Sequence, residues 1–262
     1  MPRSGWLLSA LVFLTIALLF VAPSLSDPPT EKRTTHQMMR GKLSLSQQLL
    51  HSVVIEDYAT AERQSNELAE LTREAAWMAH RTDQYRLESV EFERSAYQLA
   101  AAAREKRLSE TTLGFLGVTL SCVRCHRYLR EADEIQSNEI TIPPVAELSD
   151  DKEAKSVWMK KKLELSEAVL AGLAVGDAES IERNAQLMLT LSSVEGWARR
   201  KDAREYRALL ESFRTANQEL ITSAAKKNLD GSALAFTQVV LNCVKCHHQL
   251  RDEEKIPERA EP

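Results

Sequence analysis

Proline and glycine are scarce in the two long stretches that make up most of this chain. All eight prolines fall outside residues 38–130 and 155–252, and the whole chain contains only eight glycines. Both residue types disfavour helix interiors, so these stretches lack the usual helix breakers. They are rich in Ala, Leu, Glu, Lys, Arg and Gln, which favour helix, and strand signals are almost absent. The sequence therefore predicts an all-α protein.

The chain also has no large block of basic residues. Its formal net charge is −4 at pH 7, with positive and negative residues interspersed. Nucleic-acid-binding proteins usually concentrate Lys and Arg on one face, so nucleic acid is not expected as a partner.

Cysteine is confined to two copies of one motif. The four cysteines of the chain all lie in Cys122-Val-Arg-Cys125-His126 and Cys243-Val-Lys-Cys246-His247. Cys-x-x-Cys-His is the attachment signal for c-type haem: the thiols form thioethers with the vinyl groups and the histidine ligates the iron. On a helix these three residues share one face, so they can meet one flat macrocycle. The motifs predict two covalently attached haems, with His126 and His247 as iron ligands.

Two other interpretations of the cysteines remain open. The two pairs could jointly hold zinc through four thiolates. One pair could instead be a disulfide or a thioredoxin-like redox motif. Neither interpretation explains why a histidine directly follows both pairs, so haem is the favoured interpretation.

The two stretches are copies of one unit. Met39-Arg-Gly-Lys-Leu-Ser-Leu-Ser matches Met159-Lys-Lys-Lys-Leu-Glu-Leu-Ser 120 residues later, and after one inserted residue the haem motifs match at 121. Aromatic residues recur too, and we expect these to belong to the core rather than to contact a cofactor. They are Trp77 with Trp197 and Phe92 with Phe213.

Each repeat divides into about four helical segments joined by short connections. Helices of this length and connectivity form an antiparallel four-helix bundle, so two tandem bundles are predicted, each with its haem motif on the last helix. Asp177, Asp230 and Ser109 are expected helix N-caps. The predicted organisation is an N-terminal linker 27–37, bundle 38–130, linker 131–154 around Pro143-Pro144, bundle 155–252 and tail 253–262.

Residues 1–26 have the pattern of a secretory signal peptide. Arg3 precedes the apolar segment 6–22, and small residues precede the expected cleavage site before Asp27. The sequence thus predicts an exported, for example periplasmic, protein. Membrane contact is expected only if this segment stays uncleaved as an anchor.

The late position of the second motif bears on the other axial ligand. Only 15 residues follow His247 and none is methionine, so a distal ligand must come from upstream. A basic residue, Arg130 or Arg251, stands four positions beyond each haem histidine. With these features each repeat resembles, over about 90 residues, the class II cytochromes c. The resemblance implies four-helix bundles with haem on the last helix, either high-spin as in cytochrome c-prime or low-spin with a methionine on the first helix.

Two methionines fit that low-spin form. Met39 and Met159 alone recur at matching repeat positions, and in an up-down bundle the start of the first helix lies beside the end of the fourth. They are predicted as the second axial ligands, with core packing as the alternative and the neighbouring Met38 as a substitute for Met39. Arg130 and Arg251 are candidate partners of the haem propionates, or simply solvated bases at helix C-termini.

Together these features predict an electron carrier rather than an enzyme. Two His/Met haems leave no site for substrate and would exchange electrons with redox partner proteins, whose identity the sequence does not give; nor does it give the oligomeric state. One alternative is a five-coordinate, cytochrome c-prime-like protein that binds nitric oxide or carbon monoxide. A dihaem peroxidase is less favoured, because those enzymes have early haem motifs in loop-rich domains.

Overall fold

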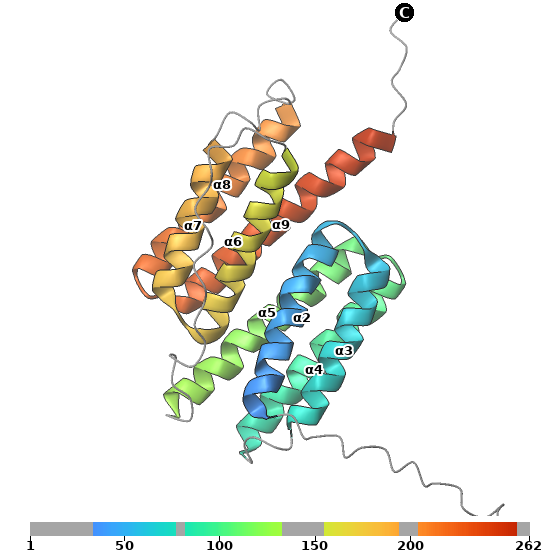
Figure 1. Cartoon of the computed structure of the whole chain (residues 1–262), viewed down its shortest axis with the longest axis vertical. Helices are drawn as coiled ribbons and strands as arrows, with labels where there is room; N and C mark the ends of the chain where they lie inside the picture. Colours follow the sequence, from blue (N-terminus) through green and yellow to red (C-terminus); the bar gives the residue numbers. More distant parts are fainter. Residues whose placement is uncertain (1–33, 77–81, 133–154, 194–203, 256–262) are drawn as a thin grey trace, which may run out of the picture. The chain divides into compact units, whose positions relative to one another are not determined.

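The regular structure of the chain is helical throughout the part that the structure describes. The computed structural model describes residues 34–76, 82–132, 155–193 and 204–255 (Figure 1). These residues form α2 (Thr35–Val54), α3 (Tyr58–Ala76), α4 (Asp83–Arg104), α5 (Leu108–Glu131), α6 (Lys155–Val175), α7 (Ala178–Ser193), α8 (Arg204–Ala225) and α9 (Leu229–Lys255). The prediction of an all-α protein is confirmed for these residues. None of the described helices is long and apolar enough to cross a membrane.

The helices form two sets of four consecutive members. In the first set α2 contacts α3, α3 contacts α4, α4 contacts α5, and α5 returns to α2; α6 to α9 repeat this order. Figure 1 shows the four helices of each set lying side by side. Matching repeat positions fill the interior of both sets, since Leu99 and Phe115 are fully buried, as are their counterparts Leu220 and Phe236. The predicted domain boundaries stay predictions, and Trp77 and Trp197 lie outside the described residues.

Asp177 caps α7 as predicted. The backbone N–H of Ser180 donates a hydrogen bond to Asp177 Oδ1 at 2.9 Å, which satisfies one of the free amide groups at the helix start. Asp177 is therefore the residue that ends the α6–α7 turn.

The other two predicted N-caps are wrong. Asp230 lies inside the first turn of α9, and Asn228 is the capping residue, accepting a 2.9 Å hydrogen bond from the N–H of Gly231. Ser109 lies inside α5, whose N-cap residue Arg107 makes no side-chain cap hydrogen bond. At α9 another good capping residue, Asn228, takes the place expected for Asp230, whereas α5 begins at the apolar Leu108 without a side-chain cap.

Gly176 ends α6 in the left-handed region of backbone space. Its φ is +80°, and a Cβ built there would lie 2.9 Å from Arg130 Cζ. A side chain at this conformation is strained, so we expect Gly176→Ala to lower the free energy of unfolding by about 1–2 kcal/mol. Urea denaturation measures the change. Gly117→Ala is the matched control, because its Cβ would meet Ser95 only at 3.5 Å and alanine favours a helix interior. Equal stability of Gly176→Ala and the parent would contradict the expectation.

The two sets of helices contact each other through their first and last members. α2 and α5 of the first set each contact both α6 and α9 of the second. At the crossing of α2 and α6, Gln47 Nε2 donates to the carbonyl oxygen of Glu167 at 3.2 Å. Gln47 and Glu167 are equivalent positions of the repeat, 120 residues apart. A contact between equivalent residues marks a pseudo-twofold arrangement, as in an isologous dimer interface.

A pair of arginine contacts follows the same symmetry. Arg130 Nη1 on α5 donates to the carbonyl oxygen of Ala174 at 3.4 Å, at the end of α6. Arg251 Nη2 on α9 donates to the carbonyl oxygen of Val54 at 3.3 Å, at the end of α2. Because both contacts join matching repeat positions, each set holds the C-terminal end of the other set's first helix.

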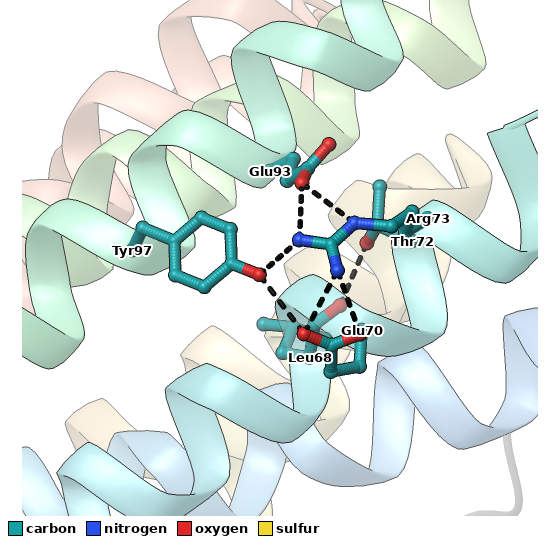
Figure 2. Close-up of polar contacts among 6 residues, drawn as sticks. All are labelled: Leu68, Glu70, Thr72, Arg73, Glu93 and Tyr97. Atoms are coloured by element: carbon teal, nitrogen blue, oxygen red, sulfur yellow. Dashed lines mark hydrogen bonds and ion pairs between the residues drawn. The ribbon is translucent and has the colours of Figure 1, made fainter.

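A polar cluster on the outside of the first set joins α3 to α4 (Figure 2). Arg73 pairs with Glu70 and Glu93, each at 3.0 Å, and the hydroxyl of Tyr97 donates to Glu70 at 3.0 Å. Arg73 is more than half exposed, so the cluster contributes little to stability. The second repeat has a serine and an arginine at the positions of Arg73 and Glu93, so this cluster is not part of the shared architecture.

Candidate haem-binding sites

The predicted members of the first site come together on one cavity. Met39 from α2 and Cys122, Cys125 and His126 from α5 all line it, and α4 supplies the facing wall. The two helices run antiparallel beside each other, which brings the start of α2 to the end of α5. The cavity itself is small, with a volume of about 60 Å³.

The second site repeats this arrangement around a much larger cavity. Met159 from α6 and Cys243, Cys246 and His247 from α9 line a cavity of about 560 Å³. The wall is mostly apolar, with side chains from α8 opposite the haem motif. In both repeats, then, the methionine, the two cysteines and the histidine meet on a single cavity.

Met38 and Met39 take different places on α2. Met38 is fully buried in the hydrophobic core and does not line the cavity, whereas Met39 is half-buried and does. The repeat match points to Met39, and that residue, not its neighbour, lines the cavity that His126 also lines.

The cysteine thiols of the motifs are shielded from water. Burial raises the pKa of Cys122 to about 12 and the pKa values of Cys125 and Cys243 to about 11. These thiols are neutral at pH 7. A thioredoxin-like redox motif requires a thiol with a lowered pKa, so these surroundings do not favour that alternative.

The motif histidines are kept neutral as well. Burial, with the nearby Arg130 and Lys42 acting in the same direction, lowers the pKa of His126 to about 4. Burial also lowers the pKa of His247, with Arg251 and Lys162 adding to the effect. The neutral imidazole is the form that binds a metal, so both side chains suit an axial ligand.

The lowered pKa of His126 predicts a pH dependence for the haem-free chain. Unfolding restores the usual pKa of 6.5. Between pH 6.5 and 4, therefore, the imidazole of His126 is protonated in the unfolded state but remains neutral in the folded state. Stability is full above pH 6.5 and falls as the pH drops toward 4, by roughly 3 kcal/mol in all. Urea denaturation at a series of pH values measures it. His126→Gln should flatten this part of the profile, and an unchanged slope in that variant would contradict the assignment.

The two cysteine pairs do not assemble a joint zinc site. Each pair lines its own cavity. Within the described ranges, no three His, Cys, Asp or Glu side chains gather in a group suited to a metal ion. The four-thiolate alternative needs both pairs at one point, which this arrangement does not provide.

Each cavity wall contains a lysine that was not predicted from the sequence. Lys42 Nζ lies 5.1 Å from the ring centroid of Phe92, and Lys162 Nζ lies 4.4 Å from that of Phe213, a cation–π contact in both repeats. Burial lowers the pKa of Lys42, and lowers that of Lys162 to about 8. The repeat match already contained the signal, because both lysines stand three residues after the matching methionines.

Phe92 and Phe213 are core residues, as predicted. Each is only 6% exposed, and each also lines its cavity beside the lysine. Each phenylalanine thus belongs to the hydrophobic core and to the cavity wall at once, so a core position does not exclude contact with a cofactor.

Each cavity is completed by the other repeat. Leu170 and Leu173 of α6 line the first cavity, while Leu50 and His51 of α2 line the second. His51 is exposed and lies at the edge of the second site.

Arg130 and Arg251 are not among the residues lining the two cavities. Both extend to the other set of helices, where Arg251 also pairs with Glu56. Arg130 Nη2 and Arg251 Nε are buried without a hydrogen-bond partner within the described part of the chain. Each arginine therefore keeps a buried donor free, and its predicted pairing with a propionate stays a prediction.

The predicted signal peptide 1–26 lies outside the described residues, as do residues 133–154 of the predicted linker 131–154. Comparison of the chain with protein-family models, with curated proteins and with solved structures gives no match.

Proposed function

We propose that the chain is an exported dihaem c-type cytochrome, built as two tandem class II-like four-helix bundles, that carries electrons between redox partner proteins. The observation that supports this most is the twofold gathering of methionine, two cysteines and histidine on one cavity per repeat. A zinc or thiol-redox role does not explain that complete set, whereas covalent haem with His/Met ligation uses every member of it.

The cavities fit a haem to different degrees. The second, at about 560 Å³ and mostly apolar, lies within the range of roughly 300–1,000 Å³ usual for ligand pockets. The first, at about 60 Å³, is filled largely by its own side chains, so haem attachment there must displace them. The donor sets are nevertheless the same in kind. Arg130 and Arg251 do not line the cavities, so each would have to turn its free guanidinium donor toward the haem to pair with a propionate.

Each residue type has a defined task toward the haem. The neutral thiols of the motif add across the vinyl groups and fix the macrocycle to α5 and α9. His126 and His247 would each offer a neutral nitrogen to the iron, and Met39 and Met159 would each offer a thioether. The apolar walls exclude water, which stabilises a fixed coordination. The haem iron would supply the one-electron couple.

Carbon monoxide addition to the reduced, haem-loaded protein tests this proposal. With both iron positions filled by histidine and methionine, we expect the visible spectrum to stay unchanged. A carbon monoxide shift in the parent protein would instead indicate open sixth positions and a gas-binding function. Peroxide turnover by the same sample would point to the peroxidase alternative.

A further inference from the structure

The walls of the two cavities differ in charge. The charged residues lining the first are Lys42 and Glu88, apart from the motif histidine. Those lining the second are Lys160 and Lys162, and no Asp or Glu is among the described residues on that wall; His51 stands at its edge. Leu209 occupies the repeat position of Glu88. The first wall is therefore formally neutral, whereas the second has two positive charges and no negative one.

Glu88 is well placed to act on the first site. Its side chain is only 12% exposed, and its Oε1 accepts a 2.9 Å hydrogen bond from Gln84. Arg124 Nε lies 3.7 Å from Oε2, but that guanidinium is half exposed and water screens it. Glu88 lines the same cavity as Cys125 and His126 of the haem motif, so its carboxylate lies at the site itself.

Charges near a haem shift its reduction potential in a known direction. Ferric haem has one more positive charge than ferrous haem, so a nearby carboxylate favours the ferric form and lowers the potential. A nearby ammonium group favours the ferrous form and raises it. Both effects are stronger in a buried pocket than in water, because the effective dielectric constant is lower.

The shared charges do not separate the two sites. Lys42 and Lys162 occupy the same repeat position and face the same part of each cavity. Arg130 and Arg251 are likewise equivalent. What differs is Glu88 on the first wall and the uncharged Leu209 at the same repeat position on the second, whereas Lys160 is exposed and matches Arg40, which has the same charge.

We propose that the two haems are electrochemically distinct, the haem of Cys122–His126 having the lower reduction potential and the haem of Cys243–His247 the higher. With His126 and His247 holding the two irons, one electron would pass from the first haem, which would be oxidised, to the second, which would be reduced, with no proton moved. This inference rests on the proposed electron-carrier function and adds a direction to it.

A spectroscopic redox titration of the haem-loaded full chain tests the inference. We expect two one-electron waves whose equilibrium constants differ by at least roughly tenfold, which corresponds to about 59 mV. Glu88→Gln should raise the lower wave and leave the upper one in place. Glu91→Gln is the matched control, since it removes a carboxylate from the same helix outside the cavity, where Glu91 pairs with Arg94.

A second variant assigns the upper wave. Lys160→Gln should lower the upper wave alone, while Lys226→Gln, a change of the same kind at an exposed position after α8, should move neither. Coincident waves in the parent, or an upper wave that moves with Glu88→Gln, would overturn the inference while leaving two low-spin haems intact. Absence of covalent haem bands would overturn the electron-carrier function as well, so the two failures are distinguishable.

Discussion

Replacing Cys243 and Cys246 together by alanine is expected to halve the covalently attached haem, from two per chain to one. The second motif would then have no thiol to add to a vinyl group, while the first repeat keeps its own complete set of residues. Pyridine haemochrome quantitation after denaturing extraction measures the ratio of covalent haem to protein. The mirrored pair, Cys122→Ala with Cys125→Ala, should give the same half-loaded protein, with haem on the second repeat only.

Two adjacent histidines in α9 test the axial ligand of the second haem in the same way, His247 as the predicted ligand and His248 as its control. His247→Gln should remove the axial nitrogen and abolish the low-spin spectrum of the second haem. His248→Gln should not, because His248 is exposed, contacts Glu56 at 2.7 Å and does not line the cavity. Full haem loading in the double cysteine variant would rule out thioether attachment at the second motif.

Replacing Met39 by leucine is expected to convert the first haem from low-spin to high-spin. Leucine conserves the volume of methionine, so packing changes little, but it has no thioether to bind iron. The open position should then take carbon monoxide when reduced, and the potential of that haem should fall, because thioether ligation raises it. Optical spectra with and without carbon monoxide measure the change. Met159→Leu should do the same to the second haem.

A buried methionine in each set of helices serves as the control for the predicted ligand in that set. Met38→Leu alters a fully buried core residue next to Met39 and should leave both spectra unchanged. Met188→Leu does the same in the second set, where the buried Met188 Sδ accepts a 3.3 Å hydrogen bond from Ser166. If Met39→Leu retained a low-spin spectrum, Met39 would be a packing residue and another group would be the ligand.

The helices could be predicted well from the sequence, and their starting residues less well. The absence of proline from two long stretches correctly indicated the helical segments, because a missing breaker acts locally and needs no tertiary information. Asp230 was wrong as a cap because Asn228, two residues earlier, is an equally favourable capping residue, and Ser109 was wrong because α5 begins at Leu108 without a side-chain cap. Asp177 was right, since Gly176 before it already stops α6.

The repeat explains why parts of the site could be found in advance. Met39 and Met159 were singled out because few methionines recur, and both lie on the cavities. Lys42 and Lys162 recur equally, but a lysine in a charged helical segment usually faces water, so burial could not be inferred. The contribution of α2 and α6 to each other's cavities also escaped prediction, because contacts between repeats depend on how the two sets pack.

The most direct test of the account is the optical spectrum of the exported, haem-loaded protein, oxidised and reduced, with haemochrome quantitation. We expect two covalent haems per chain, sharp low-spin bands on reduction and a weak methionine–iron band near the red end in the oxidised form. A protein exported and folded without covalent haem would contradict it.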